Sequence, residues 1–304
     1  MDWQSEIEAA AERIAGHVVD TPAMRSDAFG LPLEMKLEQL QHTGSFKARG
    51  AFNTLLSSDV PEAGLVAASG GNHGAAVGFA GSRLGHRAQI FVPEMAGSAK
   101  IALIERTGAA LSVVPGEYAN AMEAAQEYEA RTGAMQIHAY DAPATVAGQG
   151  TVMRDWEAQG LEADTVLIAV GGGGLIAGAL AWLAGRRKVV AVEPELSCAL
   201  NAALAAGAPV DVSVSGVAAN ALGARRIGSI CFDLAQTHLG ASVLVSDAAI
   251  LQAQRALWQA HRLLVEPAGA AALAAVLSGA YQPEPGERVA VLLCGANPAP
   301  DPLV

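Results

Sequence analysis

Cysteine is scarce in this sequence. Its 304 residues contain Cys198, Cys231 and Cys294, widely spaced and without a CxxC pair. The odd number and the spacing exclude a disulfide framework and a zinc site built on cysteine pairs. The N-terminus carries Asp2 and Glu6 where a secretion signal would have basic and then apolar residues. We therefore expect a reduced, cytoplasmic protein.

Positive charge is also in short supply. The chain has 19 Lys and Arg against 30 Asp and Glu, which gives a formal net charge of −11. Such a chain is repelled by anionic surfaces, so we expect no nucleic-acid partner and no anionic membrane. The segment 166–185 is uncharged and long enough to span a bilayer. However, four central glycines would weaken a lone helix by roughly 3–4 kcal/mol relative to alanine. No membrane span is expected.

Aromatic residues make up only 5% of the chain, whereas alanine and glycine are abundant. Apolar strand-like segments alternate with segments of helical period, which predicts an α/β fold of parallel sheets with helices on both faces. The expected strands are 33–38, 65–69, 88–92, 111–114, 135–139, 166–170, 188–192, 242–245 and 288–294. The expected helices are 5–17, 51–57, 75–84, 99–107, 117–131, 144–159, 175–184, 247–264 and 267–277. Residues 207–228 are expected to be an irregular connection.

No repeat or low-complexity linker divides the sequence. We expect a small inserted domain, residues 64–140, and a large domain formed by residues 1–63 and 141–304. Ligands bind at the carboxyl ends of strands in such sheets. Ser69, Gly171, Glu193 and Cys294 all stand directly after, or at the end of, an expected strand.

A run of four glycines follows the strand 166–170. Gly171 to Gly174 lead into a helix that starts at Leu175. A glycine turn before a helix N-terminus forms an anion site, usually for phosphate, because backbone N–H groups and the helix dipole converge there. The alternatives are a tight turn without ligand and a dinucleotide fingerprint, since Glu193 ends the next strand about twenty residues later.

Two further segments carry polar groups at expected helix starts. Lys47 lies among small and apolar residues beside Arg49. Positive potential and partial desolvation would ease loss of its proton and make it a nucleophilic amine, unless it is an ordinary surface lysine. The turn from Ser69 to His73 repeats the strand–glycine–helix design with side-chain donors, which suits a carboxylate. Alternatively, Ser69 and Asn72 cap the helix.

Four motifs together carry a family resemblance. They are Thr43-Gly44-Ser45-Phe46-Lys47-Ala48-Arg49-Gly50, Ser69-Gly70-Gly71-Asn72-His73-Gly74, the run 171–175 and Leu293-Cys294-Gly295-Ala296-Asn297. In this order and spacing they resemble the pyridoxal-phosphate enzymes of the tryptophan-synthase-β fold type (fold type II). The threonine/serine dehydratase and serine racemase group is the nearest match. The resemblance covers nearly the whole chain. It displaces the dinucleotide hypothesis, which explains neither Lys47 nor Asn72.

The resemblance implies pyridoxal 5′-phosphate as cofactor and a role for each matching residue. Lys47 is matched to the Schiff-base lysine, with Phe46 beside the cofactor ring. Asn72 is matched to the residue that bonds the phenolic oxygen, and Cys294 to the one that contacts the pyridine nitrogen. The phosphate loop is matched to Gly171, Gly172, Gly173, Gly174 and Leu175. The substrate carboxylate loop is matched to Ser69, Gly70, Gly71, Asn72 and His73. Glu266-Pro267 also resembles a family Glu-Pro pair, without a definite role.

Three departures from the family pattern stand out. Gly70 occupies the place of a serine that is the opposite-face acid/base in racemases. Glu193 matches a metal ligand, but Ala199 replaces the aspartate ligand, so no metal site is expected. The given sequence also ends at Val304, without a match to the regulatory domain of long biosynthetic dehydratases.

The expected activity is that of an ammonia-lyase that eliminates water from L-threonine or L-serine. The products are a 2-oxo acid and ammonia. Lys47 is the expected general base, and a neutral thiol at the pyridine nitrogen favours elimination over reprotonation. Alternatives are a serine racemase and a dehydratase of 3-hydroxyaspartate or another β-hydroxy amino acid. A non-enzymatic alternative is an inactive amino-acid or cofactor-binding protein. A homodimer is expected from the resemblance.

Overall fold

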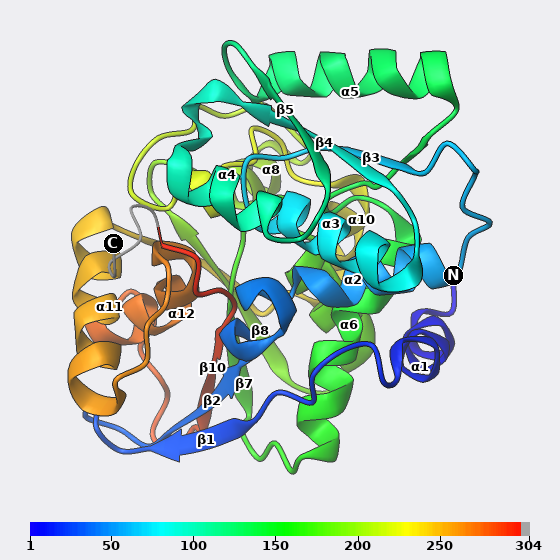
Figure 1. Ribbon diagram of the computed structural model, residues 1–304. Helices are drawn as coiled ribbons and strands as arrows, with labels where there is room; N and C mark the ends of the chain where they lie inside the picture. Colours follow the sequence, from blue (N-terminus) through cyan, green and yellow to red (C-terminus); the bar gives the residue numbers. More distant parts are fainter. Residues whose placement is uncertain (299–304) are drawn as a thin grey trace.

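A six-stranded sheet forms the core of the larger part of the protein (Figure 1). The computed structural model describes residues 1–298. The strand order is β1-β2-β10-β7-β8-β9, with β1 antiparallel to β2 and the other pairs parallel. The strands are β1 (Ala23–Ser26), β2 (Leu33–Leu37), β7 (Thr165–Ala169), β8 (Lys188–Pro194), β9 (Ala241–Val245) and β10 (Val289–Leu293).

Helices cover both faces of this sheet, which explains why its central strands are apolar on both sides. Every residue of β7 and β10 is buried. One face packs against α11 (Asp247–His261) and the alanine-rich α12 (Pro267–Ser278). The other face packs against α6 (Pro143–Ala158) and α7 (Gly174–Leu183). The remaining helices of this part are α1 (Trp3–Ile14), α2 (Lys47–Leu56), α8 (Ala199–Ala206), α9 (Ala219–Leu222) and α10 (Ser229–His238). Of these, α1 and α2 pack on α6, and α10 packs on α7.

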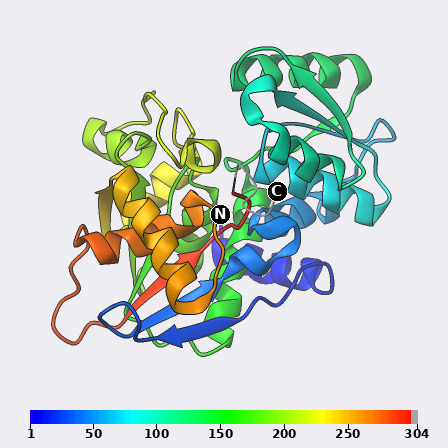
Figure 2. The same cartoon turned by 60° about the vertical axis from the view of Figure 1, so that its left-hand side comes forward.

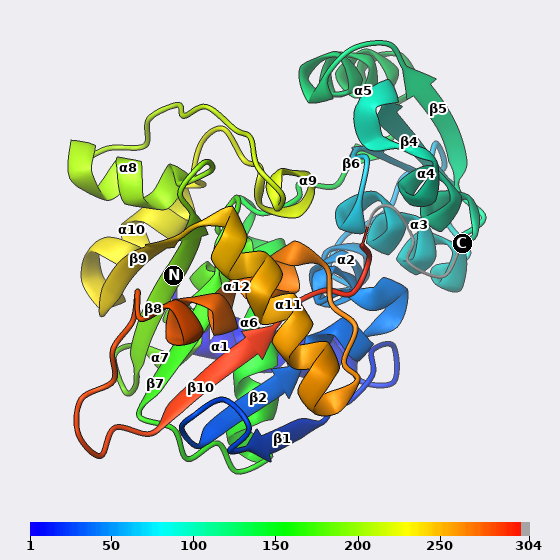
Figure 3. The same ribbon diagram turned by 90° about the vertical axis from the view of Figure 1, so that its left-hand side faces the viewer.

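A second sheet of four parallel strands lies beside the first as a separate lobe (Figures 2 and 3). Its order is β5-β4-β3-β6, from β3 (Leu65–Ala68), β4 (Ala88–Pro93), β5 (Ala110–Val114) and β6 (Met135–Gln136). Helix α5 (Tyr118–Thr132) packs on one face, and α3 (Asn72–Leu84) with α4 (Ser98–Glu105) covers the other. Three single-turn helices, η1 (Glu38–Leu40), η2 (His42–Gly44) and η3 (Glu94–Ala96), complete the described elements.

The predicted α/β class with two parallel-sheet domains is confirmed, and the differences are local. The structure adds an antiparallel edge strand, β1, and three helices, α8, α9 and α10, that the sequence pattern did not indicate. The short helix α9 lies within residues 207–228, which were expected to be irregular. Strand β6 ends at Gln136 rather than at Ala139. Helix α4 begins at Ser98, one residue before the expected start, and Gly97 is its N-cap.

All four strands of the smaller sheet lie within residues 64–140. We retain the limits of the inserted domain, 64 and 140, as a proposal. Among the described residues, no helix combines the length and the apolar character that crossing a bilayer requires.

Candidate active site

Lys47 is held at the carboxyl edge of the large sheet by backbone pairing. Ser45 forms an isolated antiparallel bridge with Gly295, just beyond β10. The N–H of Phe46 donates to the carbonyl of Cys294 at 3.3 Å. Helix α2 begins at Lys47 itself, four residues earlier than the sequence pattern predicted. The lysine motif and the last glycine motif, far apart in the sequence, are therefore neighbours.

The Lys47 side chain is a partly buried amine with one protein acceptor in the described chain. Its Nζ donates to the backbone oxygen of Ala139 at 2.7 Å and lies 5.2 Å from the centre of the Phe46 ring. Burial lowers the pKa of Lys47 to about 8, and the nearby Cys294 opposes this shift. A substantial fraction is therefore neutral at ordinary pH, as a nucleophile and base requires.

Arg49 is not the cause of this lowered pKa, contrary to the expectation from sequence. Its guanidinium is fully buried and turned into an ionic cluster, with Glu38 at 2.9 Å and Asp155 at 2.6 Å. The hydroxyl of Thr151 accepts another hydrogen bond from it at 3.0 Å. Two carboxylates compensate its charge, so Arg49 anchors the start of α2 instead of repelling the Lys47 proton.

The tetraglycine turn presents free backbone donors at the end of β7. In residues 1–298, the N–H groups from Gly171 to Ile176 have no hydrogen-bond acceptor. Gly173 has φ +94°, and a Cβ there would lie 2.5 Å from the sulfur of Cys231. A Cβ on Gly172 would overlap the ring of Tyr140. The turn can therefore be built only from glycine, and its donors form an anion cradle at the start of α7.

Asn72 lies between the two sheets at the first position of α3. Its Nδ2 donates to Oε1 of Glu266, the N-cap of α12. Its own Oδ1 accepts a 2.9 Å hydrogen bond from Asn297, which also donates to the carbonyl of Thr43 at 2.7 Å. Sequence reasoning missed Asn297 and gave Glu266 no role. The signals were the position of Asn297 inside the last glycine motif and the Glu266-Pro267 pair.

The Ser69–His73 turn does not serve as a side-chain cap. The N-cap of α3 is Gly71, and no side chain bonds the helix end. The hydroxyl of Ser69 accepts from the N–H of Gly71 at 3.2 Å. His73 donates from Nε2 to the carbonyl of Ile137 at 2.9 Å, and burial and the charge of Lys47 lower its pKa to about 3. His73 is thus a neutral, fixed part of the turn.

Cys294 lies beneath Lys47 at the end of β10. Its thiol is 3% exposed and contacts the carbonyl of Ala268 at 3.4 Å. Burial raises the pKa of this thiol far above its ordinary value, with Glu266 adding to the effect. The group is therefore a neutral thiol in the folded protein.

Comparison with known proteins agrees with this geometry. A sequence model described as "Pyridoxal-phosphate dependent enzyme" matches residues 14–295. The chain belongs to the pyridoxal-phosphate-dependent enzyme family. Within it, the chain is a member of the threonine dehydratase/serine racemase group, whose enzymes include dehydratases and ammonia-lyases.

Three relatives illustrate the similarity. A phenylserine dehydratase of Ralstonia pickettii is 34% identical over 302 residues, which covers 96% of this chain and 92% of that protein. The structure of a threonine deaminase from T.th. superposes with a TM-score of 0.90 at 35% identity, covering 96% of this chain and 97% of the other. Maize serine racemase superposes with a TM-score of 0.91 at 29% identity, covering 97% and 93%.

The residues present fit the cofactor that the family implies. The anion cradle at 171–176 suits a phosphate, and Lys47 offers a partly neutral amine at the same edge of the sheet. Asn72 and Cys294 contribute an amide and a neutral thiol nearby. When bound, pyridoxal phosphate supplies an electron sink for charge at the α-carbon of an amino acid.

Glu193 has a structural role that the sequence did not reveal. Both of its carboxylate oxygens accept backbone N–H groups at the start of α8, from Leu200 at 2.8 Å and Asn201 at 2.7 Å. This explains the helix that the sequence pattern missed. Within residues 1–298, no group of three or more His, Cys, Asp or Glu side chains is arranged to hold a metal ion.

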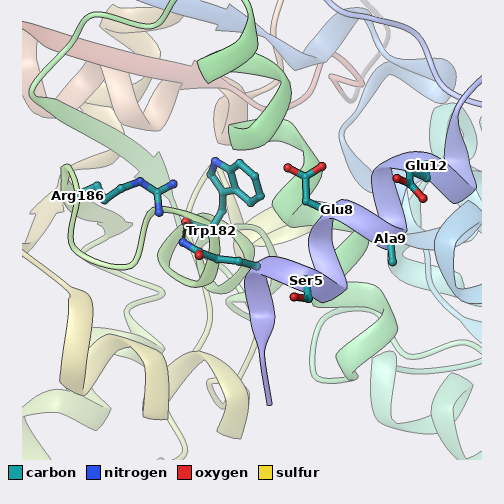
Figure 4. A pocket seen from close by; sticks show the side chains of 7 residues that line it. Ser5, Glu8, Ala9, Glu12, Trp182 and Arg186 are labelled. Carbon is teal, nitrogen blue, oxygen red and sulfur yellow. Dashed lines mark hydrogen bonds between the residues drawn. The ribbon is translucent and has the colours of Figure 1, made fainter.

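A surface pocket of about 620 Å³ lies away from these motifs, between α1 and the end of α7 (Figure 4). Its lining comprises Gln4, Ser5, Glu8, Ala9, Glu12, Trp182 and Arg186. None of these residues was predicted to be functional. The pocket is widely open, and nothing in it resembles the convergent donors around Lys47.

Proposed function

We propose that this enzyme eliminates water from an L-β-hydroxy amino acid of the threonine or serine type, yielding a 2-oxo acid and ammonia. The observation that carries the proposal is the state of Lys47. It is an amine with a pKa of about 8, fixed at the carboxyl edge of the sheet beside a phosphate-type cradle. The names of two relatives, a phenylserine dehydratase and a threonine deaminase, support the reaction class.

The chain's own groups divide the work. Lys47 in its neutral form removes the α-proton. Before this step, its Nζ donates a hydrogen bond to the carbonyl of Ala139. The N–H groups at the start of α3 bind the substrate carboxylate, because those of Asn72, His73 and Gly74 have no acceptor in the described chain. The neutral thiol of Cys294 does not stabilise a protonated ring nitrogen of the cofactor. This favours loss of the β-hydroxyl over reprotonation of the α-carbon.

A panel of β-hydroxy amino acids tests the proposal directly. L-threonine, L-serine, L-phenylserine and 3-hydroxyaspartate are each incubated with the enzyme, and 2-oxo acid and ammonia are measured. We expect equal amounts of both products from threonine or serine. If only phenylserine or 3-hydroxyaspartate gives product, the proposed reaction stands but the substrate is that amino acid and not threonine or serine. No product from any of them would refute the proposal.

Serine racemisation is the second candidate, supported by the superposition on maize serine racemase. Chiral analysis of the serine left in the same reaction distinguishes it. The non-enzymatic alternative, an amino-acid or cofactor-binding protein, is tested by borohydride reduction of the bound cofactor. A trapped adduct at Lys47 without turnover of any substrate would favour a binding protein.

A further inference from the structure

Lys100 is a buried lysine for which the sequence suggested no role. It lies in α4 of the smaller lobe and is 3% exposed. Its one hydrogen bond within residues 1–298 is long, 3.4 Å, from Nζ to the backbone oxygen of Asn220 in α9. Figure 3 shows α9 on the side of the larger lobe that faces the smaller one. Lys100 therefore reaches from one lobe to the other.

The charge of Lys100 is poorly compensated. Among the described residues, no carboxylate lies within ion-pair distance of its Nζ. Burial lowers the pKa of Lys100, and the more distant Glu266 partly opposes this shift. Glu266 itself is engaged by Asn72. Buried cations in proteins are normally paired, because desolvation without a partner is costly. An amine kept in this state is suited to an incoming anion.

The side chain points at the start of α3. A Cβ placed on Gly71 would lie 3.3 Å from Nζ of Lys100. The next N–H groups, at Asn72, His73 and Gly74, have no acceptor in residues 1–298. The ammonium thus lies next to Gly71, the N-cap residue that directly precedes these backbone donors. A glycine at position 71 leaves the space between them open.

We propose that Lys100 binds the α-carboxylate of the amino-acid substrate, together with the backbone N–H groups at the start of α3. This rests on the proposed function only in that the substrate is an amino acid. The carboxylate replaces the long bond to Asn220 and supplies the charge that Lys100 lacks. Because the lysine comes from α4 and the carbonyl from α9, substrate binding exchanges a contact between the two lobes for a contact with the carboxylate.

The test compares two ligands that differ in the carboxylate alone. L-alanine and L-alaninol both carry the α-amine, and neither has a β-hydroxyl to lose. Their binding to the holoenzyme is followed by the change in visible absorbance of the bound cofactor. Lys100→Met keeps the length of the side chain and removes its charge. We expect Lys100→Met to weaken the binding of L-alanine by about 10- to 100-fold, the range for a hydrogen bond to a charged group, and the binding of L-alaninol by less than about 3-fold.

Three further variants complete the experiment. Lys100→Arg keeps the charge and should recover part of the affinity for L-alanine. Lys188→Met removes a lysine far from the motifs and should change the binding of neither ligand. If Lys100→Met fails to hold the cofactor, Lys100→Gln, which can still donate to Asn220, takes its place.

Two results would overturn the proposal: equal weakening of both ligands, or unchanged binding of L-alanine. Either result leaves the dehydratase proposal standing. Conversely, an enzyme that eliminates no water can still bind L-alanine through Lys100, so the two proposals fail separately.

Discussion

Asn72 joins the two lobes through Glu266, to which its side-chain amide donates a hydrogen bond. The carboxyl group that receives this bond is 2% exposed, and burial raises its pKa from 4.5 to about 7. Between these two pH values the folded protein keeps a proton that the unfolded chain has released. The contribution of Glu266 to stability therefore falls as the pH rises through this window, by a total of about 3 kcal/mol.

Glu266→Gln should remove this dependence, because glutamine does not titrate and can still accept from Asn72. Urea unfolding of the cofactor-free protein at pH values from about 4.5 to 8 measures the pH dependence of the free energy of unfolding. We expect the variant to gain stability relative to the unmodified protein as the pH rises. Two other groups leave residual slopes of opposite sign in both proteins: Glu193, whose pKa burial also raises to about 7, and His73, whose pKa burial lowers to about 3. The exposed Glu195→Gln is the matched control, and a variant curve parallel to the original would contradict the prediction.

Lys47→Ala should abolish the visible absorbance of the bound cofactor and reduce turnover at least about a thousandfold, as expected for loss of a general base. The other lysines are placed differently: Lys36 is buried in a structural contact with the carbonyl of Thr21, Lys188 is on the surface, and Lys100 is directed at Gly71 beside the start of α3. Lys188→Ala is the control. Absorbance and turnover that survive in Lys47→Ala would show that another group performs its role.

The glycine motifs could be found from sequence because each is local. A strand end, a turn that tolerates no side chain and a helix start lie within a few residues of one another at Gly171 and again at Ser69. The network of Asn72, Glu266 and Asn297 could not be found, since Asn72 lies 194 residues from Glu266 and 225 residues from Asn297 in the chain.

The errors in element boundaries have physical reasons. Strand β6 stops at Gln136 because the following carbonyls, of Ile137 and Ala139, accept from His73 and Lys47. Helix α8 was missed because its cap is the carboxylate of Glu193, which precedes the helix by several residues and resembled a metal ligand. Local sequence patterns do not record such tertiary contacts.

Cys294→Ser should have a mild effect, because both side chains are neutral and of similar size. Cys294→Asp should place a carboxyl group against the carbonyl of Ala268 and protonate the cofactor's ring nitrogen. We expect slower elimination and an altered visible spectrum during turnover, with thermal unfolding as the check on folding. If aspartate leaves the spectrum and the product ratio unchanged, Cys294 does not contact the ring nitrogen.

Gly70 has no side chain to supply a proton on the face opposite Lys47, so elimination should greatly outpace racemisation. The structure adds that a Cβ on Gly70 would lie 2.6 Å from Cβ of Ala96 and 3.3 Å from Cδ of Pro93. A serine side chain at this position would point against η3 and not into open space. Gly70→Ser alone should therefore destabilise the loop without producing a racemase.

The double variant Gly70→Ser with Ala96→Gly separates the two effects. Removing the Ala96 methyl group relieves the close contact, so the double variant should recover the stability lost in Gly70→Ser. With the loop restored, the new hydroxyl can deliver a proton, and D-serine should rise relative to 2-oxo acid. Ala96→Gly alone is the control. Chiral analysis of residual serine during turnover gives the answer, and rapid formation of D-serine by the unmodified enzyme would show that racemisation does not depend on a side chain at position 70.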